Sequence, residues 1–563
     1  MGRSSTLLFL LATCGFAQDS ARLDQIVQSY VAGNHFMGTV LVAKDDQVIL
    51  SKGYGSANLE WNIPNTPSTK FRLGSITKQF TAACILLLEE RGKLKIEDPV
   101  SKYMADAPPA WDKITIYHLL THTSGIPNFT SFSDYSTTEA LPSSAEKTVS
   151  RFRDKPLDFE PGSKFSYSNS GYVLLGYLIE KISGQSYDKF LQENIFTPLA
   201  MKDSGYDSNS AVITRRAAGY APGGSSGLVN AGFVNMTIPG GAGGLYSTTE
   251  DLLKWERGLF GGKVLTAGSL QKMTTPFKDE YAFGLLVRAE RDRKQFWHNG
   301  GIEGFNTSMA YYPDSKVVVA VLANVNDPSP DAMLPKLAAA AHGDIVQLTS
   351  ERKEITVPSD VLRRYVGVYG MAPAVNFVIS LVGNQLTSQL SGQGEVPLFA
   401  ESETTFFTKV VDAQIEFPKD DTKGPASRLI LHQNGRDMTA KRLGEVEAKK
   451  ITDAIAALNQ RFKDQAAAPG SEAALRRMIG ELRNGKPNYD LLSADLAKTT
   501  RQQLPQLQSM IIDMGALQSV NFKGVGPGGA DIYQVKFEKG SLEYRIWLGT
   551  DGKTDRANVR RSE

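Results

Sequence analysis

The strongest hydrophobic pattern in the chain starts just after RLGSITKQF, residues 72–80. It runs on as QFTAACILLLEERG, about four helical turns with almost no polar face, and Gly92 is placed to end the helix. A helix that is apolar nearly all round is a buried helix. Ser75 and Lys78 lie three residues apart at its first turn, so they share one face. Because a buried lysine is costly, the pattern indicates a lysine that has a use.

Alternating hydrophobic positions predict strands at both ends of a first domain, 20–345. Residues 38–55 alternate on both sides of a polar turn, as a hairpin does, and alternating runs return between 295 and 324. Helical patterns and Gly/Pro/Ser loops fill most of the interval between them, and an alanine-rich helix is expected over 331–342. This order predicts an antiparallel sheet that both ends of the domain complete and that helices cover.

The rest of the chain divides into smaller units, because 563 residues are too many for one core. A polar linker is expected over 346–360, and short alternating runs broken by Gly, Asn and Asp predict a small β-barrel or sandwich over 361–445. A helical linker, 446–469, leads to a final unit, 470–563, in which helical patterns precede strands. The expected fold class is therefore multidomain α+β.

Charge argues against two classes of partner. The chain is 41% hydrophobic and 22% charged, and its formal net charge is only +2 without a run of like charges. Neither a nucleic-acid partner nor an anionic membrane is indicated by these values. Apart from the N-terminal segment, no apolar run approaches transmembrane length.

The N-terminus has the pattern of a secretory signal peptide over residues 1–17. Arg3 precedes a short apolar run, 7–12, and small residues follow. The protein is therefore expected to be secreted or periplasmic. The alternative is that the protein is a lipoprotein, with a lipid attached to Cys14. Cys84 is the only other cysteine, so no internal disulfide is expected in the mature chain.

The Ser-x-x-Lys spacing of Ser75 and Lys78 occurs four more times in the chain, so position and not spacing decides its meaning. Only this pair opens a strongly apolar helix, where the helix N-terminus and desolvation shift a lysine toward its neutral form. A neutral amine one turn away can accept the hydroxyl proton and so make the serine a nucleophile. The alternative is an N-cap serine beside a lysine that reaches solvent.

Two further stretches carry candidate chemistry. In PGSKFSYSNSGYVLLG, Tyr167 can act as a general base if nearby cations lower its pKa, and Asn169 offers an amide to a lysine and a substrate carbonyl. In FWHNGGIEGF, His298 ends a strand, and the glycines after it let the backbone approach a ligand. The N–H groups of Ser75 and Gly301 are then candidate oxyanion donors. Taken alone, each stretch also fits a structural role, either an aromatic anchor with an Asx cap or a hairpin with a satisfied histidine.

In this order, the stretches resemble the serine β-lactamase and penicillin-binding protein family, in its class C and esterase-like branch. LLTHTSGIP (119–127), PGSKFSYSNSGYVLLG (161–176) and GGAGGLYSTTEDLLKW (240–255) support the resemblance, which covers about 330 residues. It implies a β-lactamase/transpeptidase-like domain, an antiparallel sheet flanked by helices, with no cofactor and no metal. The 361–445 unit resembles the lipocalin-like barrel that follows this domain in some relatives.

The resemblance also implies roles for four residues. Ser75 is similar to the acylated nucleophile, and Lys78 to its partner in proton transfer. Tyr167 is similar to the general base and acid, and Asn169 to the substrate-binding residue beside it.

The family's third motif, usually Lys-Thr-Gly, falls on His298, Asn299 and Gly300, which are therefore expected to bind substrate. Ser75 and Gly301 are expected to form the oxyanion hole. Histidine in place of lysine is a departure, because a histidine is mostly neutral at pH 7.5. Losing a charge-assisted contact to a substrate carboxylate costs roughly ten- to a hundredfold in affinity. The expectation therefore moves toward esters, amides or D-aminoacyl peptides, without excluding β-lactams.

The expected function is a serine hydrolase that acts on a small-molecule or peptide substrate through an acyl-enzyme. The alternative from another class is a non-catalytic sensor or scaffold that binds peptides or cell-wall fragments with the same fold. His118 and His122 have the i,i+4 spacing of a zinc helix but lack its glutamate and a third ligand, so they are interpreted as structural. The sequence does not indicate the oligomeric state.

Overall fold

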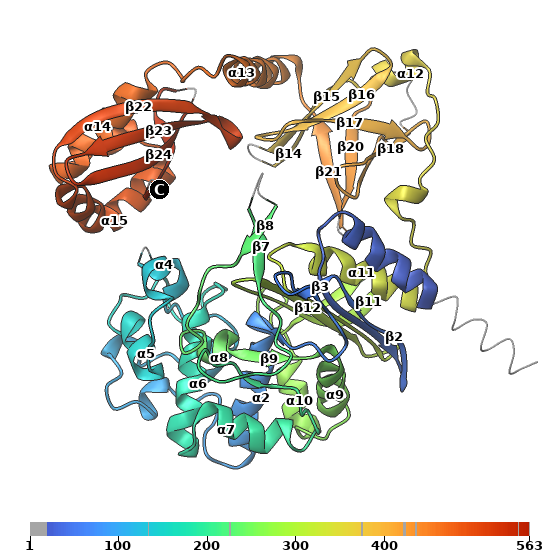
Figure 1. The fold of residues 1–563 in the computed structure, drawn as a ribbon, viewed down its shortest axis with the longest axis vertical. Helices are drawn as coiled ribbons and strands as arrows, with labels where there is room; N and C mark the ends of the chain where they lie inside the picture. Colours follow the sequence, from blue (N-terminus) through green and yellow to red (C-terminus); the bar gives the residue numbers. More distant parts are fainter. Residues whose placement is uncertain are drawn as a thin grey trace, which may run out of the picture. The chain divides into compact units, whose positions relative to one another are not determined.

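The computed structural model describes residues 20–132, 134–223, 227–372, 375–419, 424–433, 436–549 and 551–561. The expected signal peptide, 1–17, and Cys14 within it lie outside the described residues. The chain forms two compact units, Met1–Leu348 and Thr349–Glu563, whose helices and strands are labelled in Figure 1.

A six-stranded antiparallel sheet forms the frame of the first unit. Across the sheet its strands are β10 (Leu286–Glu290), β11 (Arg293–Ile302), β12 (Phe305–Tyr312), β13 (Val317–Ala323), β1 (Gly38–Lys44) and β2 (Gln47–Tyr54). β1 pairs with β13 from Gly38 opposite Ala323 to Lys44 opposite Val317. Both ends of the domain therefore complete the sheet, as the alternating patterns predicted.

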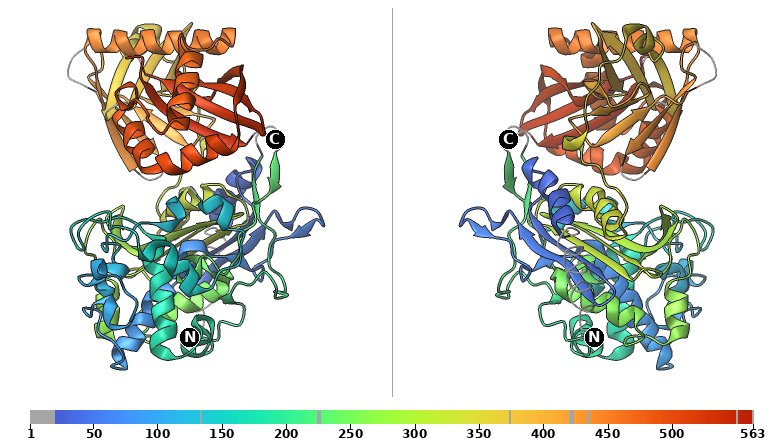
Figure 2. Two further views of the ribbon diagram at one scale, coloured as in Figure 1. Left: turned by 90° about the vertical axis from the view of Figure 1, so that its left-hand side faces the viewer. Right: turned by 90° about the vertical axis from the view of Figure 1, so that its right-hand side faces the viewer.

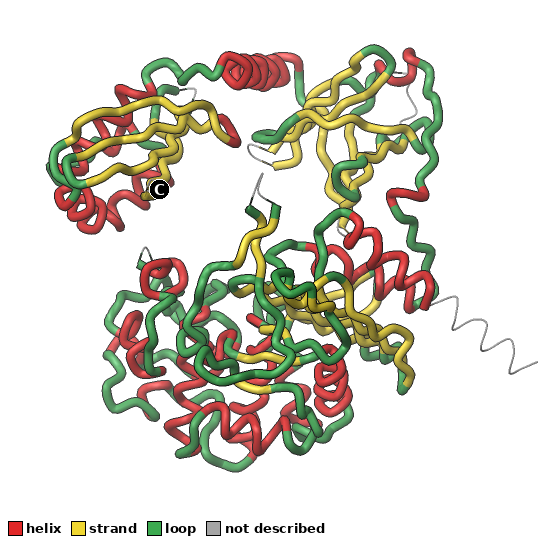
Figure 3. Tube along the Cα trace, in the orientation of Figure 1, coloured by secondary structure: helices red, strands yellow, loops and turns green. Residues whose placement is uncertain are grey.

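Helices cover both faces of this sheet, and for that reason every residue of β13 is buried. On one face, a helix over residues 20–32 and α11 (Ser329–Ala341) bury apolar side chains against the strands. On the other face, Leu253 of α9 (Thr249–Phe260) packs against Leu41 and Val318. Figures 2 and 3 show the sheet between these helices.

Most of the helices lie between β2 and β10, in the segment that carries the candidate site. They are α2 (Thr77–Glu90), α3 (Ile116–Leu120), α4 (Tyr135–Thr138), α5 (Ala145–Arg153), α6 (Asn169–Ser183), α7 (Tyr187–Leu191), α8 (Gly240–Gly243), α9 and α10 (Ala267–Met273). Short strands join them, namely β3 (Ser56–Asn58), β4 (Ile63–Pro64), β5 (Phe71–Arg72), β6 (Gly205–Tyr206), β7 (Tyr220–Pro222), β8 (Leu228–Asn230) and β9 (Leu245–Ser247).

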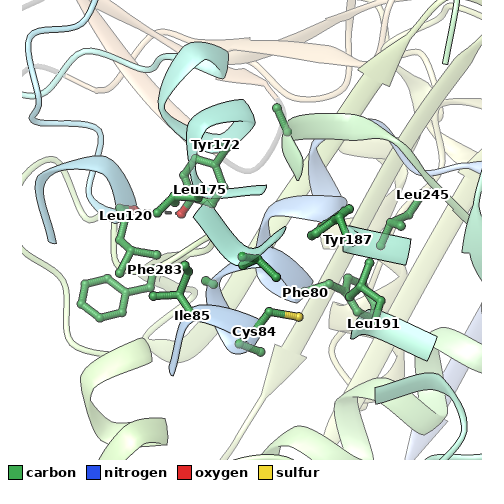
Figure 4. Close-up of a cluster of buried hydrophobic side chains, with 14 of the residues drawn as sticks. Phe80, Cys84, Ile85, Leu120, Tyr172, Leu175, Tyr187, Leu191, Leu245 and Phe283 are labelled. Carbon is green, nitrogen blue, oxygen red and sulfur yellow. Dashed lines mark hydrogen bonds between the residues drawn. The ribbon is translucent and has the colours of Figure 1, made fainter. Parts of the chain in front are cut away.

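α2 is the buried helix that the apolar run predicted, since every residue from Thr77 to Leu88 is buried. Figure 4 shows Phe80 and Cys84 of this helix in a cluster with side chains of neighbouring elements, including Tyr172 of α6. Cys84 is a core residue, and burial raises the pKa of its thiol. Gly92 has a φ of 68°, the left-handed conformation that ends a helix at a glycine.

The second unit begins with a closed antiparallel barrel. After α12 (Ser359–Arg363), its strands are β14 (Gly367–Ala372), β15 (Val375–Val382), β16 (Gln385–Leu390), β17 (Glu395–Ala400), β18 (Thr405–Thr408), β19 (Ala413–Glu416), β20 (Arg428–Gln433) and β21 (Arg436–Arg442). β14 closes the ring against β21, with Tyr369 opposite Arg442. Aromatic side chains such as Phe377, Phe406 and Phe417 form its core. The likeness to lipocalins remains a prediction.

A small α+β region ends the chain. α13 (Glu445–Asp464) leads to α14 (Ser471–Arg483), α15 (Ala494–Asp513) and a sheet of β22 (Leu517–Gly526), β23 (Ala530–Phe537), β24 (Gly540–Leu548) and β25 (Thr554–Arg561). Leu475 and Ile479 of α14 share a core with Tyr533 and Val535 of the sheet. The expected fold class, multidomain α+β with a barrel, is confirmed. Over the described residues, no helix is both long and apolar enough to cross a membrane.

Candidate active site

Ser75 and Lys78 meet where a 3₁₀ turn, η1 (Gly74–Ile76), runs into α2. Lys78 is fully buried, at 0% exposure, whereas Ser75 is half-buried. Lys78 Nζ lies 2.9 Å from Ser75 Oγ and 2.9 Å from Asn169 Oδ1, and 2.8 Å from the carbonyl oxygen of Ala242. The lysine therefore points inward at the serine and does not reach solvent.

These three contacts determine which way a proton can move. Asn169 Oδ1 and the Ala242 carbonyl oxygen only accept hydrogen bonds, so each takes one N–H of Lys78. The contact with Ser75 can run in either direction, because a hydroxyl both donates and accepts. A neutral Lys78 thus keeps its lone pair facing the serine proton.

Burial favours this neutral form of Lys78. Desolvation lowers the pKa of Lys78 well below its usual value, and within the described ranges no carboxylate forms an ion pair with it. Lys78 is therefore suited to accept the proton of Ser75 as its oxygen attacks a carbonyl.

Tyr167 stands beside this pair, on the segment that leads into α6. Lys78 Nζ lies 4.8 Å from the centre of its ring. Burial raises the pKa of Tyr167, and a side-chain hydrogen bond with Ser75 opposes that shift only in part. A tyrosine base needs a lowered pKa, and the shift found here has the opposite direction, which favours a Tyr167 that donates a proton. The catalytic role of Tyr167 stays a prediction.

Asn169 is held by neighbours on both sides. Its backbone N–H donates to Asn128 Oδ1 over 3.0 Å, and its side-chain Nδ2 donates to Thr130 Oγ1 over 3.1 Å. Because the amide nitrogen is engaged with Thr130, the amide oxygen faces Lys78. The structure thus brings Tyr167 and Asn169, which are neighbours in the sequence, together with the distant Ser75 and Lys78.

The predicted oxyanion donors also come together. A Cβ on Gly74 would lie 2.8 Å from the backbone nitrogen of Gly301, and a Cβ on Gly300 would lie 2.0 Å from the carbonyl oxygen of Leu73. Only glycines permit β11 and η1 to approach so closely. Ser75 and Gly301 therefore line the same pocket, and the role of their N–H groups as oxyanion donors stays a prediction.

His298 is in the site region but has no hydrogen-bonding group left for a substrate. It is 2% exposed, its Nε2 lies 3.1 Å from the hydroxyl of Tyr281, and its Nδ1 lies 2.6 Å from the carbonyl oxygen of Asn299. Since a carbonyl only accepts, the proton is on Nδ1 and Nε2 accepts from Tyr281. Burial, with a smaller effect of Lys78, lowers the pKa of His298 to about 3.

The side chain of Asn299 is not in the site. Its Nδ2 donates to Asp331 Oδ2 of α11 over 2.6 Å. α11 packs on one face of the sheet, and α9 packs on the opposite face. Neighbouring residues of a strand point to opposite faces, so His298 and Asn299 cannot both face Ser75. The prediction of a substrate-binding side chain at Asn299 is therefore corrected, while Gly300 contributes through its lack of a side chain.

His122 was interpreted from the sequence as structural, and the structure places it against the site. Its ring lies 4.3 Å from that of Tyr167, its Nδ1 accepts from the Ser168 N–H over 3.1 Å, and its carbonyl oxygen accepts from the Ser166 N–H. It therefore orients the segment that carries Tyr167. The sequence feature that could have indicated this role is the position of His122 in LLTHTSGIP, one of the stretches that support the family resemblance. Over the described residues, no three His, Cys, Asp or Glu side chains gather as a metal site requires.

A pocket opens beside Ser75, with a volume of about 440 Å³ when the solvent at its mouth is included. Its walls are Gly74, Ser75, Phe129, Thr130, Tyr135, Asn169, Val234, Pro239, Ala242, Gly243, Gly301, Ile302 and Glu303. Ser75, Asn169 and Gly301 therefore line one small space. Sequence reasoning did not single out Glu303, although it lies in the quoted FWHNGGIEGF stretch.

Comparisons with known proteins agree with this geometry. The chain is 28% identical over 438 residues to penicillin-binding protein 4* of Bacillus subtilis, an alignment that covers 73% of this chain and 95% of that protein. A penicillin-binding protein homologue from Pyrococcus abyssi, described as octameric, is 27% identical with a TM-score of 0.54 and covers 75% of this chain and 99% of its own. A D-amino acid amidase from Ochrobactrum anthropi shares the fold, at 24% identity and a TM-score of 0.53, over 58% of this chain and 99% of its own.

Two family profiles match the chain. The barrel region, residues 351–442, matches a domain of unknown function, DUF3471. The profile described as Beta-lactamase matches residues 23–343, more than half of the chain and all of the site described above. The chain belongs to the beta-lactamase family.

Proposed function

We propose that the chain is a serine hydrolase that cleaves an ester or amide through an acyl-enzyme on Ser75. The observation that carries this proposal is the buried Nζ of Lys78, 2.9 Å from Ser75 Oγ and bonded otherwise only to acceptors. Two acceptors would suffice to hold a structural lysine. A third contact to a half-exposed hydroxyl adds a route for a proton.

The reaction follows from the positions of these groups. Ser75 Oγ attacks the carbonyl carbon while its proton passes to Lys78, and the N–H groups of Ser75 and Gly301 hold the developing oxyanion. Tyr167 gives its proton to the departing group and is reprotonated from Lys78. Water then attacks the acyl-enzyme by the reverse route, which releases the acid and returns the proton to Ser75.

The electrostatics of the site favour substrates without a carboxylate at the position of the family's third motif. His298 is neutral and both of its nitrogens are engaged, so it cannot grip an anion. We therefore propose esters, amides and D-aminoacyl peptides as substrates in preference to β-lactams. Location is proposed on the N-terminal sequence alone: the chain is exported and cleaved after residue 17, which N-terminal sequencing of the mature protein tests.

The test is the mass of the intact protein after exposure to p-nitrophenyl acetate and, separately, to benzylpenicillin. An adduct of acyl size in the wild-type protein and none in Ser75→Ala is expected with the ester, together with release of p-nitrophenol. Lys78→Met should abolish turnover while leaving the fold intact, because its thioether fills the same space. Binding of benzylpenicillin that is equal in Ser75→Ala, without turnover of either compound, would instead indicate a sensor or scaffold.

A further inference from the structure

Glu303 gives the pocket beside Ser75 a charge. Among the described residues that line this pocket, Glu303 is the only Asp, Glu, Lys, Arg or His, and the other walls are apolar, aromatic, glycine or neutral polar residues. It follows Gly301 by two positions, in the turn between β11 and β12, and it is half-buried. Whatever part of a substrate enters this pocket therefore meets a carboxylate.

In the proposed mechanism, the part that enters this pocket is the acyl group. The departing group must collect a proton from Tyr167, so it has to leave on the side of the site where Tyr167 lies. Neither Tyr167 nor His298 is a wall of the pocket that holds Glu303. The acyl group, which stays bonded to Ser75, therefore occupies the side that Gly301, Asn169 and Glu303 line.

The surroundings of Glu303 supply no compensating cation. Burial raises the pKa of Glu139, and the nearness of Glu303 and a side-chain hydrogen bond with it add to this shift. The cation Arg151 lies near Tyr135 of the pocket wall, but its guanidinium donates hydrogen bonds to Asp134 and Thr138 and not to Glu303. No ion pair to either glutamate is formed within the described part of the chain. A cation that enters the pocket would therefore meet two neighbouring carboxyl groups and no competing ion pair.

We propose that Glu303 selects substrates whose acyl group carries an ammonium close to the scissile carbonyl. The proposal rests on the proposed hydrolase function of the same site. The Glu303 carboxylate accepts hydrogen bonds from the ammonium, and the aromatic ring of Tyr135 in the same wall adds a surface that attracts cations. The substrate class is therefore aminoacyl esters or amides with a free amine, and not carboxylate-bearing β-lactams.

Two matched pairs of methyl esters test this proposal by the methanol they release at pH 6.5, where an α-amine is mostly protonated. Alanine methyl ester of each hand is compared with methyl isobutyrate, and β-alanine methyl ester with methyl butanoate. Each pair exchanges an ammonium for a methyl group of similar size, at the first or the second carbon from the carbonyl. For the wild-type protein, we expect kcat/KM to be at least tenfold higher for the ammonium ester of one pair.

The variants locate the effect. Glu303→Gln should reduce that ratio to within about threefold of unity. Glu303→Lys should bring the ratio of kcat/KM for the ammonium ester to that for the methyl-bearing ester below unity, because the positive charge of the lysine repels the ammonium. Glu146→Gln, an exposed glutamate in the first turn of α5, is the matched control and should leave the ratio unchanged.

The outcomes separate the two proposals. A protein that hydrolyses the methyl-bearing esters and p-nitrophenyl acetate without preferring the ammonium esters overturns the role of Glu303 but keeps the hydrolase. A preference that survives in Glu303→Gln overturns it as well, and points to another recognition group. A protein that releases no product from any ester and gains no acyl adduct at Ser75 overturns the hydrolase itself.

Discussion

The position of Asn169 allows the proton route to be tested by exchanging one atom for another of similar size. Asn169→Asp replaces the amide by a carboxylate, and the oxygen that Lys78 contacts stays 2.9 Å from Nζ. If neutral Lys78 accepts the proton of Ser75, kcat/KM rises with pH through the pKa of Lys78 in the free enzyme. A carboxylate at this distance stabilises the ammonium and raises that pKa, so the rising limb should move to higher pH.

The distance sets the magnitude of this shift. Two unit charges 2.9 Å apart attract by about 6 kcal/mol at an effective dielectric constant of about 20, and by about half as much at twice that value. At ~1.4 kcal/mol for each pKa unit, the pKa of Lys78 should rise by roughly two to four units. Activity at neutral pH should therefore fall by about a hundredfold or more and recover as the pH is raised.

The assay is the pH dependence of kcat/KM for p-nitrophenyl acetate, corrected for spontaneous hydrolysis. Asn169→Leu is the matched control, because it removes the acceptor oxygen without adding a charge. This variant should lower kcat/KM without moving the rising limb of its pH profile to higher pH. If Asn169→Asp kept the wild-type profile, the group that titrates would not be Lys78, and the proton route described above would be wrong.

Three further outcomes follow from single residues. Glu256 is 2% exposed, and burial raises its pKa to about 8 from 4.5, so the unfolded chain loses this proton first and the free energy of unfolding falls as pH rises from about 4.5 to 8. Glu256→Gln should remove this loss, which is on the order of 3 kcal/mol at pH 7. Calorimetry should then show a fall in the unfolding midpoint from pH 5 to pH 8 that is larger for the wild-type protein than for the variant, and equal falls would contradict the prediction. Gly300→Ala places a Cβ 2.0 Å from the Leu73 carbonyl oxygen, so esterase activity should fall at least a hundredfold while far-ultraviolet circular dichroism stays unchanged. Tyr167→Phe removes only the hydroxyl and should lower kcat by 10²–10⁴, and an unaltered kcat would assign proton donation to another group.

The sequence predicted the parts of the fold and site that depend on neighbouring residues. A continuous apolar run after Ser75 predicted a buried helix, and the structure shows that Lys78 at its first turn is buried as well. Alternating positions similarly predicted the strands, and their occurrence at both ends of the domain predicted the pairing of β1 with β13. The resemblance to the family then indicated that Tyr167 and Asn169 belong with the serine.

The errors arose where an environment is made by distant segments. Burial raises the pKa of Tyr167, whereas a role as base requires a lowered pKa, and no local pattern reports burial at a turn. The side chain of Asn299 points to α11 because it follows His298 in a strand, and the helix that receives it comes later in the chain.

The sequence by itself thus determined the secondary structure, the strands at the two ends of the sheet and the place of Ser75 and Lys78 at the start of a buried helix, because each follows from periodicity within a few turns. Only the tertiary structure decided the protonation of the site and the charge of its pocket. Tyr281 and Asn299 occupy both nitrogens of His298, and Glu303 lines the pocket of Ser75, more than 200 positions away in the chain. Desolvation and hydrogen bonding set these properties, and both depend on which distant residues meet.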